Sequence, residues 1–95
     1  MAEGDVLFVD VVAADRRVWE GDALSFIART TEGDIGIMPG HESMAGLLKP
    51  GEFAINRVDG DRLVGSIDSG FVSVDNNRVT VVADEVSLDS EARSA

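Results

Sequence analysis

Residues 23–40 have the sequence ALSFIARTTEGDIGIMPG, and this stretch decides the fold class. Its first eight residues largely alternate apolar and polar side chains, the period of a β-strand with one buried face. The expected buried face of this strand carries Leu24, Phe26 and Ala28. Residues 32–34 (EGD) predict a hairpin tip, because glycine adopts positive φ without strain. A second, shorter strand is expected over residues 35–38 before the Pro-Gly pair.

The same β-pattern extends over most of the chain. Residues 6–14 (VLFVDVVAA) place Leu7, Val9, Val11 and Ala13 on one face. A short segment over residues 17–20 is expected to stop at Gly21-Asp22, before the strand that begins at Ala23. Turn signals recur about every 8–12 residues, which is typical of a sandwich or barrel. The predicted fold class is therefore all-β.

Size and charge exclude several classes of function. The 95 residues suffice for one domain, and 8 basic against 18 acidic side chains give a net charge of −10. A nucleic-acid-binding protein or a polybasic membrane anchor needs a basic surface, so neither is expected. The longest apolar run, residues 6–14, is far shorter than the ~20 residues of a membrane helix. The acidic start also lacks the basic region of a signal peptide.

The side chains offer little for catalysis or metal binding. Cysteine and tyrosine are absent and His41 is the single histidine, so neither a thiolate nucleophile nor a histidine metal cage can be built. Two acid pairs, Asp59/Asp61 and Asp84/Glu85, are interpreted as solvated turn residues, because so small a chain barely fills one core. We expect no enzyme activity, no cofactor and no metal.

Other motifs leave the function open. The glycines between residues 33 and 46 lack the Lys-Ser/Thr pair of a phosphate-binding loop. Trp19 is interpreted as a partly buried strand residue, with a partner-contact anchor as the alternative. Composition and spacing alone thus predict a small acidic β-sandwich that serves as a binding subunit.

One motif is more specific. Residues 31–41 (TEGDIGIMPGH) resemble the central signature of the ε subunit of F-type ATP synthases, and an apolar strand and a Pro-Gly turn follow at residues 44–51. Residues 9–21 are similar to the family's opening strands and residues 69–84 to its closing strands. The resemblance extends over about residues 5–90.

The resemblance implies a fold and a role. The fold would be a flattened β-sandwich of two antiparallel five-stranded sheets over residues 1–84, with a short tail over residues 85–95 that forms at most one helical turn. The role would be that of a non-catalytic subunit of the rotor's central stalk, which couples proton flow to ATP synthesis. The implied partners are the γ subunit and the c-subunit ring. The chain would reach the cytoplasmic face of the bacterial membrane only as part of that complex.

The resemblance also suggests which residues contact these partners. They lie on two connections that we expect at one end of the sandwich, and they are Glu32, Asp34, Met38 and His41. By analogy with the family, Asp34 would face an arginine of the ring and His41 would lie nearer to γ.

Two other classes of function remain as alternatives. A free-standing sandwich that binds a sugar or a peptide is the second hypothesis, and an enzyme is the third. Co-purification of γ would favour the stalk subunit over the sugar-binding module, and screens against glycosides and esters would test for an enzyme.

The family continues with a helical hairpin, which in some members binds ATP, whereas the printed sequence stops at Ala95. We therefore expect these residues to bind γ through the sandwich alone and not to bind ATP. Calorimetry with ATP and magnesium checks this. Saturable binding at micromolar to low-millimolar ATP would contradict it and would place a nucleotide site on the sandwich itself.

Overall fold

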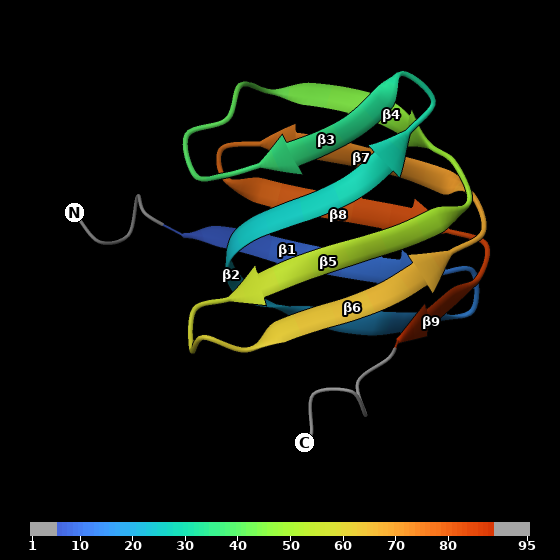
Figure 1. Ribbon diagram of the computed structural model, residues 1–95, viewed down its shortest axis with the longest axis horizontal. Helices are drawn as coiled ribbons and strands as arrows, with labels where there is room; N and C mark the ends of the chain where they lie inside the picture. Colours follow the sequence, from blue (N-terminus) through green and yellow to red (C-terminus); the bar gives the residue numbers. More distant parts are fainter. Residues whose placement is uncertain (1–5, 89–95) are drawn as a thin grey trace.

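The computed structural model describes residues 6–88, which form nine β-strands arranged in two packed layers (Figure 1). The strands are β1 (Leu7–Ala13), β2 (Arg16–Thr30), β3 (Gly33–Ile37), β4 (Met44–Leu48), β5 (Gly51–Arg57), β6 (Arg62–Ile67), β7 (Gly70–Asp75), β8 (Arg78–Ala83) and β9 (Val86–Leu88). No helix occurs within residues 6–88, so the described part offers no helix that could cross a membrane.

Strand β2 belongs to both layers. Its first half pairs with β1, and its second half pairs with β5 and β3. When β2 is counted in both layers, the strand order of the back layer is β2-β1-β8-β7-β4. The strand order of the front layer is β3-β2-β5-β6-β9. The prediction of an all-β sandwich with two five-stranded layers is therefore confirmed, with one strand shared between them.

The shared strand bends sharply where it changes layers. In Figure 1 it runs leftward beneath β1 and then returns rightward across the front. A register irregularity lies between Ala23 and Ser25, and it turns Leu24 outward while Phe26 and Ala28 stay buried. The prediction that Gly21-Asp22 ends one strand is thus wrong, because the bend keeps strand geometry. The prediction that Leu24 is buried is also wrong, because the register irregularity is a β-bulge that turns this side chain outward.

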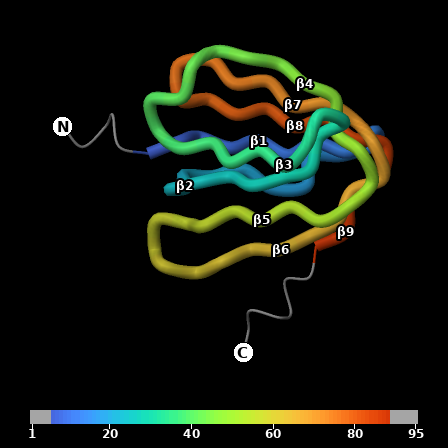
Figure 2. Tube along the Cα trace, turned by 45° about the horizontal axis from the view of Figure 1, so that its top comes forward, coloured from blue at the N-terminus to red at the C-terminus, as the bar shows by residue number. Residues whose placement is uncertain are grey.

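One pairing departs from the predicted antiparallel sheets. β1 and β8 run parallel, with Val9 beside Val79 and Val11 beside Val81. β4, β7, β8 and β1 can be followed in this order in Figure 2. Alternation along a strand shows which face is buried, but not the direction of a neighbour that lies 70 residues away in the sequence. The other pairings among residues 6–88 are antiparallel.

The core lies between the layers and follows the period-two pattern. The expected buried face of β1 is confirmed, since its alternate residues from Leu7 to Ala13 are buried. Phe26 of β2 stacks on Phe53 of β5 with 6.1 Å between the ring centroids. The largest fully buried side chains are Phe26, Leu7, Ile37, Ile55, Val9, Val11, Val72, Val74, Val79 and Val81.

The described part of residues 85–95, which the sequence assigns to the tail, continues the front layer. β9 pairs with β6, with Val86 opposite Ile67 and Leu88 opposite Gly65. Val86 is buried in the core, and Leu88 packs against it. The helical turn expected near residues 90–93 lies outside the described residues.

Gly70 tests how tightly β7 and β8 approach each other. A Cβ atom at Gly70 would collide with the Val82 carbonyl oxygen and lie 2.7 Å from the Ala83 Cα, both backbone atoms that cannot rotate away. We expect Gly70→Ala to lower the free energy of unfolding by about 2–3 kcal/mol, measured by urea denaturation.

Gly36→Ala is the matched control, because a Cβ there meets no atom within 4 Å. Its unfolding free energy should stay within about 0.5 kcal/mol of the parent chain. Equal losses in the two variants would contradict the close β7–β8 contact.

Candidate functional site

The β2–β3 hairpin tip is held by its own threonine. The buried Thr30 hydroxyl donates to the Gly33 carbonyl at 2.7 Å and accepts from the Glu32 amide at 3.1 Å. Gly33 has φ of 122°, which confirms the predicted reason for a glycine at this position. The hydrogen bonds give the tip a defined shape and leave the Glu32 carboxylate outside.

Asp34 lies on the outer face of the front layer. It stands opposite Arg29 across the β2–β3 ladder, and its carboxylate lies 3.9 Å from the Arg29 guanidinium. The two side chains are 74% and 58% exposed, so this ion pair contributes about 0–1 kcal/mol at most. Asp34 can therefore exchange Arg29 for a partner's cation at little cost.

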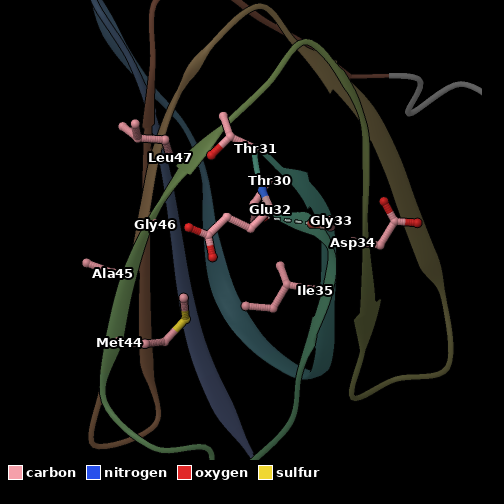
Figure 3. Close-up of a pocket in the computed structure, with 10 residues that line it drawn as sticks. All are labelled: Thr30, Thr31, Glu32, Gly33, Asp34, Ile35, Met44, Ala45, Gly46 and Leu47. Atoms are coloured by element: carbon pink, nitrogen blue, oxygen red, sulfur yellow. Dashed lines mark hydrogen bonds between the residues drawn. The ribbon is translucent and has the colours of Figure 1, made fainter.

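A cleft of about 280 Å³ separates β3 from β4. At one end of the cleft, β4 is joined to the β2–β3 turn, where the Thr31 amide donates to the Leu47 carbonyl at 3.1 Å. Figure 3 shows Glu32 reaching into the opening, Ile35 and Met44 on the cleft walls, and Asp34 pointing away from it. The cleft thus has the apolar side chains Ile35 and Met44 on its walls and the Glu32 carboxylate at its opening.

The loop after β3 is tied to the β7–β8 turn. The Gly40 amide donates to the Asn77 side-chain oxygen at 2.8 Å, and the Ser43 hydroxyl donates to Asp75 at 2.9 Å. His41 donates its amide to the Met38 carbonyl at 3.1 Å, and its ring Nδ1 lies 2.8 Å from the Glu42 carbonyl. Met38 itself is exposed.

The four residues predicted from the sequence do not share one end of the sandwich. Glu32 and Asp34 lie where β3 begins, whereas Met38 and His41 lie beyond its other end. In Figure 1 the turn before β3 is at the right and the loop after β3 is at the left. A five-residue strand spans about 13–17 Å, so the expectation of a single end is wrong.

Sequence reasoning missed the residues that position these groups. Thr30 holds the tip, and Asn77 holds the loop from 37 residues away. Asn76 and Asn77 form the β7–β8 turn, and both have positive φ, 52° and 63°. Asparagine at a hairpin turn was the available signal, but the loop that it binds could not be known without the fold.

The acid pairs Asp59/Asp61 and Asp84/Glu85 are exposed residues at or beside turns and are not arranged as catalytic pairs. Asp59 accepts from the Asp61 amide at 3.0 Å and from Arg57 at 3.2 Å, so it organises the β5–β6 turn. Within residues 6–88, no group of three or more His, Asp or Glu side chains is arranged to hold a metal ion. Every buried side-chain polar atom in this part has a hydrogen-bond partner.

Comparison with known protein families decides the class. The family model of the ATP synthase delta/epsilon chain β-sandwich domain matches residues 6–89. The chain belongs to this family. The match confirms the sandwich fold and the resemblance seen in the signature at residues 31–41, and it places the chain among non-catalytic subunits.

Curated relatives of this family are close in sequence. The ATP synthase epsilon chain of Streptomyces avermitilis is 44% identical over 85 residues, which cover 90% of this chain and 68% of that protein. The epsilon chain of Rhodococcus jostii is 46% identical over 81 residues, covering 84% and 66%. The chain therefore corresponds to about the first two thirds of these relatives, the sandwich domain.

Chains in two solved structures have the same fold. A chain of the Euglena gracilis mitochondrial ATP synthase superimposes with a TM-score of 0.84 at 22% identity, covering 93% of this chain and 59% of that one. A chain from the Tetrahymena thermophila mitochondrial ATP synthase gives 0.72 at 18% identity, covering 93% and 70%.

Asn77 provides a test of the loop attachment. Asn77→Gly tolerates the positive φ but removes the side-chain oxygen that accepts from the Gly40 amide. Because a net hydrogen bond contributes about 1 kcal/mol, we expect a loss of about that size in unfolding free energy and faster hydrogen exchange at Gly40.

Asn76→Gly is the matched control, since Asn76 also has positive φ and no side-chain hydrogen bond to the loop. It should leave exchange at Gly40 unchanged. Protection at Gly40 that survives Asn77→Gly would show that other contacts hold the loop.

Proposed function

We propose that this chain acts as the epsilon subunit in the central stalk of a proton-translocating F-type ATP synthase. There it binds the γ subunit and the ring of c subunits and helps to couple proton flow to ATP synthesis. The observation that carries this proposal is the 44% identity, over 90% of the chain, to the epsilon chain of Streptomyces avermitilis. The Tetrahymena chain with the same fold comes from a structure of central stalk and c-ring.

The architecture suits a part that transmits torque. Because β2 hydrogen-bonds within both layers, the layers cannot slide past each other without breaking ladder bonds. The β4 edge also joins β2 at the Thr30–Leu48 pair. A cross-braced body of this kind deforms little when it is pushed from the side, as a rotor element must.

We assign the ring contact to the end of the sandwich that carries the tip. Glu32 and Asp34 are exposed there, and the β1–β2 turn at Asp15 lies at the same end (Figure 1). A contact at this end would place the chain on the ring, at the cytoplasmic face of a bacterial membrane. Met38 and His41 lie at the opposite end, so they are not assigned to the same contact and are kept as candidates for γ.

Asp34 tests the ring contact. Asp34→Ala should weaken binding of the chain to an isolated γ–c-ring subcomplex by at most about fivefold, because exposed ion pairs contribute about 0–1 kcal/mol. The difference from the parent chain should be largest at low ionic strength and shrink as salt screens the pair, measured by biolayer interferometry at several salt concentrations.

Asp61→Ala is the control, because it removes the same charge from an exposed turn at the opposite end of the sandwich. It should bind the subcomplex like the parent chain. Equal weakening in both variants would attribute the effect to net charge and refute a ring contact through Asp34.

A further inference from the structure

The turn between β5 and β6 contains a junction of a kind that is chemically reactive in peptides. Asp59-Gly60 is the one place in the sequence where aspartate or asparagine precedes glycine. Glycine has no Cβ atom to hinder the approach of its amide nitrogen to the preceding side-chain carboxyl group. The junction lies at the end of the β5–β6 hairpin, at the lower left of Figure 1, and the Asp59 side chain is 53% exposed.

The reaction available here rearranges the main chain and needs no reagent except water. The Gly60 nitrogen attacks Cγ of the protonated Asp59 carboxyl group, a C–N bond forms, and the hydroxyl group leaves with the amide proton as water. Water then opens the resulting cyclic succinimide at either carbonyl group. Opening at one carbonyl restores aspartate, and opening at the other gives isoaspartate, in which the main chain runs through Cβ and Cγ.

Hydrogen bonds in the folded turn oppose both requirements of this reaction. Attack needs a free amide nitrogen, but the Gly60 amide donates to the Arg57 carbonyl at 3.0 Å. Departure of a carboxyl oxygen needs that oxygen free to take up a proton, but both Asp59 oxygens already accept hydrogen bonds. One accepts from the Arg57 guanidinium at 3.2 Å and the other from the Asp61 amide at 3.0 Å.

Arg57 contributes to this arrangement through its side chain and its main chain. Its carbonyl accepts from Gly60, its amide donates to the Asp61 carbonyl at 2.8 Å, and its guanidinium donates to Asp59. The two main-chain contacts survive a change of side chain. The guanidinium contact is therefore the part of the arrangement that a substitution of Arg57 removes.

We propose that Asp59-Gly60 is a site of isoaspartate formation and that the Arg57 guanidinium suppresses the reaction in the folded chain. The additional main-chain atom of isoaspartate would lengthen the turn and break the hydrogen bond from Gly60 to the Arg57 carbonyl. A chain that has been unfolded for a time would thus carry a lasting covalent mark at this hairpin. The reaction needs only the turn and water, so it does not depend on which partners the chain binds.

Incubation in warm neutral buffer, followed by digestion with the protease Asp-N, tests the proposal. Asp-N cuts before aspartate but not before isoaspartate, so isomerised chains keep the Val58–Asp59 bond, and mass spectrometry measures their fraction. Arg57→Gln should raise the rate at Asp59 about two- to fivefold, the modest factor that an exposed ion pair supplies. The parent chain unfolded in urea, where the three hydrogen bonds are lost, should react at least about tenfold faster than the folded parent.

Arg62→Gln is the matched control. It removes the same charge from the same hairpin, but Arg62 donates to the Asn56 side chain at 3.0 Å and not to Asp59. This variant should react at the parent rate. Thermal melts establish that each variant is folded, and the comparison of folded with urea-unfolded parent chain needs no variant at all.

Each contrary outcome overturns a defined part of the proposal. A folded Arg57→Gln variant that reacts at the parent rate refutes the role of the guanidinium, and equal acceleration in Arg62→Gln refutes it by attributing the effect to net charge. A folded parent chain that reacts as fast as the unfolded chain shows that the turn gives no protection. An Asp59 that stays intact even in urea refutes the modification site itself.

Discussion

The structure depends on one strand that hydrogen-bonds in both layers. β2 pairs with β1 in the back layer and with β5 and β3 in the front layer, and the bulge at Leu24 lets it bend between them. The bulge moves one residue out of the alternation, so Phe26 and Ala28 still face the core on the far side of the bend. Without it, the second half of the strand would turn its apolar face to water.

The same constraint decides which surfaces remain for partners. Joining the layers through β2 brings the β2–β3 turn and the edge of β4 together at Thr31 and Leu47 and leaves a cleft between β3 and β4 beyond that point. The tip projects from one end and the Met38–His41 loop from the other, and the exposed side chains of Leu47, Phe71 and Val82 lie on the outer face of the back layer. A small acidic chain thus presents an end, an edge and a broad face, as expected of a subunit that contacts several neighbours at once.

The candidate site shows the limits of local reasoning. The glycine at the tip was predicted correctly, because a hairpin turn needs positive φ within a few residues. The placement of Asp34 and His41 at one end was wrong, since the strand between them separates the two connections. The hydrogen bond from the Gly40 amide to the Asn77 side chain was not predictable. It joins residues 37 positions apart, and they become neighbours only through a strand order that no local pattern encodes.

The sequence by itself determined the all-β class and the buried face of β1, because alternation and turn residues act over a few neighbouring positions. The motif at residues 31–41 indicated the family by resemblance. Only the tertiary structure decided the parallel β1–β8 pair, the bend in β2 and the alignment of Val12, Val82, Phe71 and Leu47. These features depend on which distant strands become neighbours and in which register. The free energy that selects them comes from packing both layers around a single core. It depends on contacts between many segments and cannot be read from any one of them.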